Sequence, residues 1–125
     1  MLAARFFKLG ALYGLIGIAL GVYMGASHDH SQMPTHAHLN LLGFVSMMLF
    51  GGYYRLHPAA NHTMLARMHF WLSNIGLWMM IVGLFVMFSG NMGAEPLTAV
   101  GSIVVLISMA MFVAVTLRTK TPTAY

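Results

Sequence analysis

Four long apolar stretches, separated by short polar segments, most constrain what this chain can fold into. They lie near residues 6–25, 36–56, 65–88 and 97–117. Each has the roughly 20 residues that a membrane-spanning helix needs. Because a backbone inside lipid must satisfy its own hydrogen bonds, such stretches form helices. The sequence therefore predicts an all-α integral membrane protein with four transmembrane helices in a single domain, residues 1–125.

The composition excludes several classes of protein. Hydrophobic residues make up 59% of the chain and charged residues only 6%, whereas soluble domains carry about 25% charged residues. There is no cysteine, which excludes disulfides, thiolate metal sites and iron–sulfur clusters. The net charge of +4 comes with no basic cluster, so we expect no nucleic-acid partner. The lipid bilayer is the expected surrounding.

The charged residues predict the orientation of the four helices. The six Lys and Arg residues lie at the start of the first stretch, around the second connection and after the fourth stretch. Alternating helices place all of them on one side, and both carboxylates, Asp29 and Glu95, on the other. Cytoplasmic segments of membrane proteins carry the excess of Lys and Arg. We therefore expect a bacterial-type inner membrane protein with both termini in the cytoplasm.

Two histidines, His36 and His38, open the second apolar stretch near the predicted outer face. Polar side chains at membrane depth usually have a function, and histidine is a common ligand of metals and haem iron. Two residues along a helix correspond to about 200° of rotation, so the two imidazoles point to nearly opposite faces. They cannot both bind one ion from a single helix, so either they serve two sites or each pairs with a ligand from another helix. The alternative is a pair of interfacial histidines that bond water or lipid headgroups. Asn40 lies one turn below His36 and can orient its ring.

The connection before this stretch offers a second candidate site. His28, His30 and Met33 lie close together in sequence at the predicted outer surface. Imidazole, thioether and carboxylate groups can bind copper or zinc. The alternative is a solvated polar loop without a metal.

The remaining histidines lie toward the predicted inner face. His57 and His62 flank a turn, where solvated loop positions are the expected explanation. His69 lies deeper in the third stretch, and we expect it to bond a carbonyl or hydroxyl of a neighbouring helix.

Glycines recur along one side of the first stretch. Most follow the spacing of small residues that lets membrane helices approach closely. We expect them to pack within the protomer or against a second copy. These glycines are Gly10, Gly14, Gly17, Gly21 and Gly25.

Two segments resemble a known family. Residues 36–44, HAHLNLLGF, followed by residues 53–58, YYRLHP, resemble the His-x-His helix of haem–copper oxidase catalytic subunits. The cbb3-type and nitric-oxide-reductase branches look closest. Residues 67–72, RMHFWL, are similar to small four-helix proteins described as oxidase-like. The resemblance covers the second and third apolar stretches.

The resemblance implies a particular assembly and cofactor. The family's large subunit has twelve membrane spans in three four-helix arcs, so four spans imply a homotrimer. In the family the two histidines of the motif face two different haems. His36 of one protomer and His38 of the next are thereby implied as the axial ligands of one haem b at each interface. Such bis-histidine haem is low-spin and carries electrons to or from a redox partner that the sequence does not identify.

The chain departs from the family where oxygen chemistry would need other residues. A copper centre there uses further outer-face histidines, but the third stretch ends at Ser89, Asn91 and Met92. The predicted helices also contain no buried carboxylate or lysine to relay protons. The resemblance therefore implies an oxidase-like protein that binds haem and transfers electrons, whereas these departures count against oxygen reduction and proton pumping. Outer-face copper or zinc binding or sensing is the alternative, and an assembly module without a cofactor is a third.

Overall fold

The computed structural model describes residues 1–120, and all regular structure within them is helical. The last five positions of the predicted domain lie outside the described residues. The elements are α1 (Leu2–Ser27), α2 (Met33–His38), η1 (Leu39–Val45), α3 (Ser46–Leu56), α4 (Pro58–Asn61), α5 (Met64–Phe88), η2 (Met92–Ala94) and α6 (Glu95–Arg118).

Three helical segments are long and apolar enough to cross a membrane by length and composition: α1, α5, and η2 together with α6. They contain the predicted stretches 6–25, 65–88 and 97–117. This confirms the prediction of an all-helical protein and indicates an integral membrane protein. The fourth predicted stretch, 36–56, falls in α2, η1 and α3.

The elements α2, η1 and α3 follow one another without leaving helical backbone angles. The junction residues Leu39 (φ −63°, ψ −41°) and Ser46 (φ −63°, ψ −42°) are both right-handed helical. Between them the chain forms a π-helix, in which the N–H of Ser46 bonds the carbonyl of Leu41 five residues earlier. Such wide turns are rare and often occur at functional sites. The sequence analysis did not predict this one.

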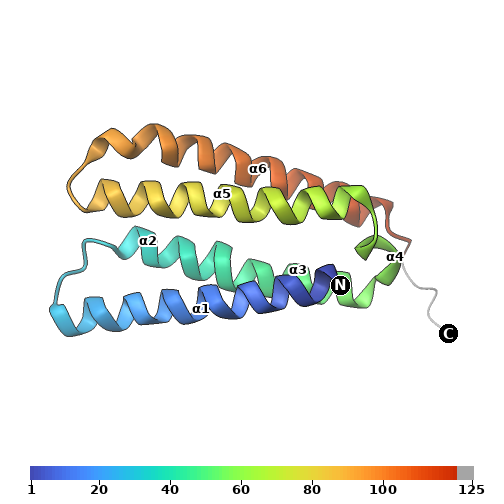
Figure 1. Cartoon of the computed structure of the whole chain (residues 1–125), viewed down its shortest axis with the longest axis horizontal. Helices are drawn as coiled ribbons and strands as arrows, with labels where there is room; N and C mark the ends of the chain where they lie inside the picture. Colours follow the sequence, from blue (N-terminus) through green and yellow to red (C-terminus); the bar gives the residue numbers. More distant parts are fainter. Residues whose placement is uncertain (121–125) are drawn as a thin grey trace.

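The helices form two antiparallel pairs that lie side by side (Figure 1). One pair is α1 with the run α2–η1–α3, and the other is α5 with α6. The N-terminus, α4 and the end of α6 lie at one end of the bundle. The connections α1–α2 and α5–α6 lie at the other.

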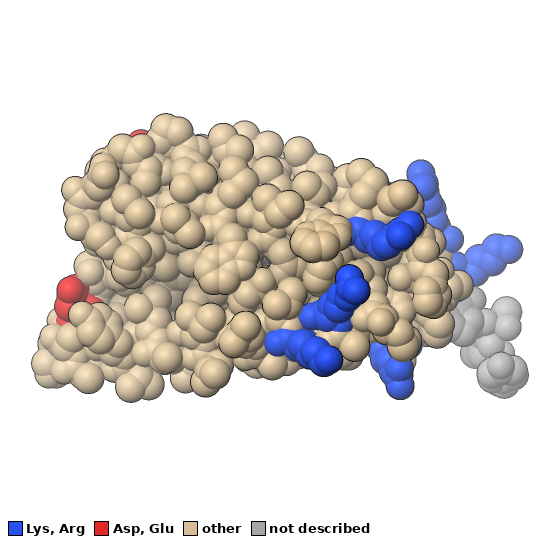
Figure 2. Space-filling view, in the orientation of Figure 1, with Lys and Arg blue, Asp and Glu red and all other residues tan. Residues whose placement is uncertain are grey.

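Charge is segregated along this bundle (Figure 2). Lys and Arg gather at the end that holds the N-terminus, and Asp and Glu lie at the opposite end. Between the ends the surface is apolar, with Leu15 of α1 67% exposed and Leu106 of α6 68% exposed. An apolar surface of this extent with charges at its ends suits a lipid surrounding.

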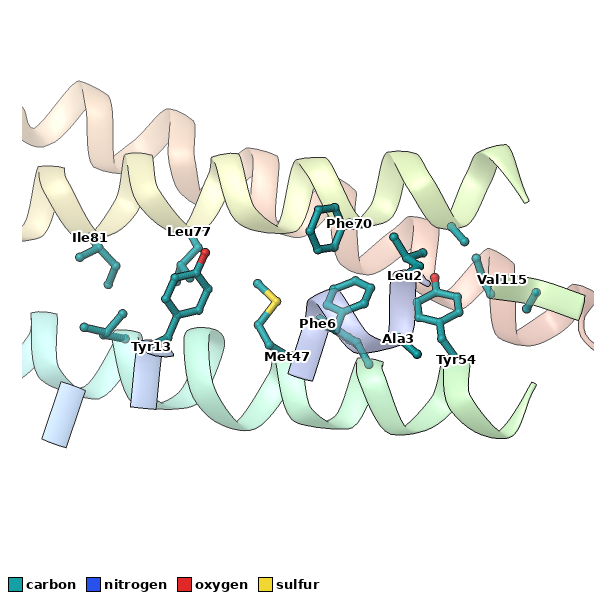
Figure 3. Packing of buried hydrophobic residues seen from close by; sticks show 14 residues of the cluster. Leu2, Ala3, Phe6, Tyr13, Met47, Tyr54, Phe70, Leu77, Ile81 and Val115 are labelled. Carbon is teal, nitrogen blue, oxygen red and sulfur yellow. The ribbon is translucent and has the colours of Figure 1, made fainter. Parts of the chain in front are cut away.

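An aromatic cluster occupies the core between the two helix pairs (Figure 3). Phe6 is fully buried. It stacks on Tyr54 at a ring distance of 5.5 Å and meets Phe70 edge-on at 5.0 Å. Aromatic pairs in these arrangements add to the stability that apolar burial provides.

The glycines of α1 allow close contact with the run α2–η1–α3. A Cβ atom at Gly10, Gly14, Gly17 or Gly21 would meet that run within 3.1 Å, whereas one at Gly25 would meet nothing within 4 Å. Of the two predicted alternatives, packing within the protomer is therefore confirmed for the first four. The side chains opposite them are Met47, Phe44, Asn40 and His36.

A second glycine contact joins α5 to α6. A Cβ atom at Gly101 would lie 2.6 Å from the backbone nitrogen of Met80, and one at Gly76 would lie 2.9 Å from that of Val105. Side chains do not fit between the two helices at these points, so the backbones touch. The sequence analysis did not single out these glycines.

Polar side chains link α1 to α5 inside the bundle. The hydroxyl of Tyr13 donates to Oδ1 of Asn74 at 2.5 Å and accepts from Nε1 of Trp78 at 3.2 Å. The amide of Asn74 in turn donates to the carbonyl of Phe70 at 2.8 Å. Buried polar groups cost free energy unless they are paired, so these bonds help to fix how the helix pairs lie against each other.

Candidate functional site

His36 lies against α1 and makes a hydrogen bond that defines its tautomer. Its Nδ1 lies 2.8 Å from the carbonyl oxygen of Gly17. Because a carbonyl only accepts, Nδ1 carries the proton and Nε2 keeps its lone pair. The ring lies directly over Gly21, where an added Cβ would come within 2.7 Å of Cε1. The glycines of α1 therefore make room for this imidazole.

His38 is held in the same tautomer by its own helix. Its Nδ1 lies 2.7 Å from the carbonyl oxygen of Pro34, one turn earlier. The same reasoning places the proton on Nδ1 and leaves the lone pair on Nε2. A neutral histidine that donates its other N–H to a carbonyl is the usual arrangement of a metal-binding imidazole.

The Nε2 atoms of both rings are not fully buried. In the described part of the chain the fully buried polar side-chain atoms without a partner are Asn61 Nδ2 and His69 Nε2. His36 and His38 are each half-buried, and their Nε2 atoms are not in that group. Each of the two imidazoles can therefore donate the lone pair of its Nε2 atom to a metal.

Asn40 lies one turn below His36, as the sequence predicted. Its Nδ2 donates to the carbonyl of His36 at 2.8 Å and lies 3.2 Å from Nδ1 of the ring. Both nitrogens carry hydrogen, because Nδ1 donates to Gly17, so the shorter contact to the carbonyl is the hydrogen bond. Asn40 packs beside the ring and over Gly17, which restricts how the imidazole can turn.

The two rings point in different directions from α2. His36 is turned toward α1, whereas His38 bonds within its own helix. The backbone between them is regular α-helix, which separates the two directions by about 200°. A single protomer therefore does not present both Nε2 atoms to one centre.

The connection between α1 and α2 is organised by its own hydrogen bonds. His28 adopts a left-handed conformation with φ of 56° at the end of α1. Asp29 Oδ1 accepts the backbone N–H of Ser31 at 3.0 Å, and this bond lowers the pKa of the Asp29 carboxyl below its ordinary value. His30 is exposed, and Met33 is 48% exposed. No group of three or more His, Cys, Asp or Glu that could hold a metal occurs among residues 1–120.

A glutamine that the sequence analysis overlooked anchors the start of α2 to α5. Gln32 Nε2 donates to the carbonyl of Phe85 at 3.1 Å and to Ser89 Oγ at 3.0 Å. Its Oε1 accepts the hydroxyl of Thr35 at 2.6 Å. Gln32 is only 8% exposed, so these bonds fix the end of the helix that carries His36.

Three further histidines, His57, His62 and His69, lie between the end of α3 and the first turns of α5. His69 Nδ1 lies 3.0 Å from the Tyr54 hydroxyl, which confirms the expected bond to a neighbouring helix. The ring is fully buried and stacks on Phe112 at 5.1 Å. His57 donates Nδ1 to the carbonyl of Tyr53 at 3.0 Å. His62 is exposed, as expected for a loop residue.

Comparison of the chain with known protein families, curated proteins and solved structures finds no match. The function is therefore inferred from the chemistry of the residues. His36, His38 and His57 each place Nδ1 against a backbone carbonyl. Of these, His36 and His38 are the pair that lies on one helix, two residues apart.

Proposed function

We propose that this protein is a membrane haem b protein that transfers electrons. His36 of one protomer and His38 of the next would be the two axial ligands, at the interfaces of a homotrimer. The observation that carries this proposal is the pair of Nδ1–H bonds to the carbonyls of Gly17 and Pro34. They leave two lone pairs free on Nε2 atoms that are not fully buried, as haem iron requires.

The proposal includes four membrane spans. The continuous helical run from Met33 to Leu56 spans nearly as many residues as α5, and we assign it as the second span. The cations at one end of the bundle support an orientation with both termini in the cytoplasm of a bacterial-type inner membrane. His36 and His38 then lie near the outer face.

The need for a second copy follows from the directions of the two rings. Because His36 and His38 diverge by about 200° on one helix, two copies must meet for both to bind one iron. Three copies would give one site at each interface, similar to the three arcs of the family described above. The exposed apolar sides of α1 and α6 provide surface for such contacts.

A bound haem b would supply a reversible one-electron change at the iron. The residues of the chain hold it in place. The carbonyls of Gly17 and Pro34 orient the two imidazoles through their Nδ1 atoms, and Asn40 restricts the ring of His36. Electron transfer to an unidentified redox partner is the activity we propose for the protein.

Titration of the purified protein with haem b tests this proposal. We expect a visible spectrum whose bands sharpen on reduction, and we expect His36→Ala and His38→Ala each to abolish it. His62→Ala is the matched control, because His62 is exposed at the opposite end, and it should leave the spectrum unchanged. A wild-type protein that shows no haem spectrum under these conditions would refute the proposal.

The same preparation distinguishes the alternatives. A copper or zinc protein would be colourless or weakly coloured, and its stoichiometric metal would be lost when His28 and His30 are replaced. An assembly module would bind neither haem nor metal, and its oligomeric state would not respond to substitution of His28, His30, His36 or His38.

A further inference from the structure

A cavity opens at the cationic end of the bundle, far from His36 and His38. It has a volume of about 550 Å³ and lies where the ends of α3 and α6 meet α4 and the start of α5. Its size is typical of pockets that bind small ligands. No residue of the proposed haem site lines it.

The lining of this cavity combines apolar and charged side chains. Most of it is apolar, including Leu56, Leu65 and Val115, with His57, Thr63 and Thr119 as its uncharged polar members. Arg118, the last residue of α6, and Lys120 also line it. A ligand that fits must therefore combine an apolar part with a negatively charged part.

No acidic side chain lies at this end of the bundle to neutralise Arg118 and Lys120. The two acidic residues of the chain, Asp29 and Glu95, are both at the opposite end of the bundle. A cation at the C-terminus of a helix is favourable for the helix dipole, which explains Arg118 alone. It does not explain the second cation, Lys120, which follows the helix and lines the same cavity.

The position along the bundle identifies the ligand. The other cations gather at the same end (Figure 2), which is the cytoplasmic end under the positive-inside rule. The cytoplasmic leaflet contains anionic phospholipids, and basic pockets between membrane helices bind their headgroups. Guanidinium matches the geometry of a phosphate oxygen pair, and an ammonium adds a point charge.

We propose that this cavity is a binding site for one anionic phospholipid per protomer. Arg118 and Lys120 contact the phosphate, and the start of an acyl chain lies along Leu56 and Leu65. This site is independent of the proposed haem ligation, and the two can fail separately.

The test measures binding of phosphatidylglycerol and phosphatidylcholine to the detergent-purified full chain by native mass spectrometry. We expect wild type to retain one phosphatidylglycerol per protomer in preference to phosphatidylcholine. The double variant Arg118→Gln, Lys120→Gln should lose about tenfold or more in affinity, because charge-assisted hydrogen bonds contribute most of the preference.

Two further variants make the result specific. Arg5→Gln, Lys8→Gln removes the same charge from the same end without touching the cavity, and it should leave binding unchanged. Arg118→Lys, Lys120→Arg keeps both charges and should restore binding, which separates a lost contact from a misfolded protein.

Three results would overturn the proposal. Equal losses in the two charge-removing variants would mean diffuse electrostatic attraction, and equal retention of both lipids would mean a nonspecific apolar groove. If a variant that ends at Lys120 binds phosphatidylglycerol many times more tightly than the full chain, then residues 121–125, and not a lipid, occupy the cavity.

Discussion

Replacement of Gly101 by alanine will push α5 and α6 apart. The new Cβ would lie 2.6 Å from the backbone nitrogen of Met80, 2.9 Å from Cβ of Met79 and 3.0 Å from the carbonyl carbon of Met79. Two of these three atoms belong to the backbone, so no change of rotamer removes the clash. The helices must separate, and their contacts on both sides of Gly101 weaken.

The size of the effect follows from two opposing contributions. Overpacking a tight contact costs about 1–3 kcal/mol. Alanine is favoured over glycine in helices by up to about 1 kcal/mol, which offsets part of that cost. Because the clash involves backbone, we expect a net loss of about 1–2 kcal/mol in the free energy of unfolding.

Reversible unfolding in detergent micelles with increasing dodecyl sulfate measures this loss. Both tryptophans, Trp71 and Trp78, lie in α5, so their fluorescence reports on the affected helix. Gly52→Ala is the matched control, because a Cβ there meets nothing within 4 Å. It should be as stable as wild type or up to about 1 kcal/mol more stable, since alanine is favoured over glycine in a helix. Equal stability of the two variants would refute the close α5–α6 contact.

Three further predictions concern hydrogen bonds. Tyr13→Phe leaves Oδ1 of Asn74 without its donor and should lower the free energy of unfolding by about 1 kcal/mol. Tyr23→Phe, at an exposed position, should leave it unchanged. Equal free energies of unfolding for the two variants would contradict the buried bond. Asn61→Ala removes the acceptor of the Ala3 backbone N–H in the first turn of α1 and should speed amide hydrogen exchange in that turn. Unchanged protection would be evidence against the hydrogen bond from Ala3 to Asn61. In an NMR titration the carboxyl of Asp29 should show a pKa below its ordinary value, because a backbone N–H stabilises the charged form. The charged Asp29 carboxylate therefore stabilises the turn at pH values above its ordinary pKa, and this stabilisation is lost as the pH falls through the lowered pKa. A titration midpoint at or above the ordinary pKa would contradict the bond.

Hydropathy and spacing predicted the features that depend on local sequence. The long apolar stretches correspond to the helices because lipid-compatible length is a property of the sequence itself. The glycines of α1 predicted close packing, and the structure assigned its partner as the second helical run. The bond from His69 to a neighbouring helix followed from the cost of leaving a buried imidazole unpaired.

Features that depend on distant residues were not predictable in this way. Gln32 bonds Phe85 and Ser89, more than fifty residues away, and nothing near it in sequence indicates those partners. The π-helix of η1 needs one extra residue in a turn, and no residue type marks that change. The tautomers of His36 and His38 depend on which carbonyls their Nδ1 atoms reach, which only the folded chain defines.

The spin state of the ferric protein tests the central claim most directly. After reconstitution with haem b, electron paramagnetic resonance of the oxidised protein should show a low-spin signal, because the proposal gives the iron two imidazole ligands. His36→Ala or His38→Ala should convert that signal to high spin or remove the haem altogether. A high-spin signal from the wild-type protein, or no bound haem, would contradict ligation by His36 and His38.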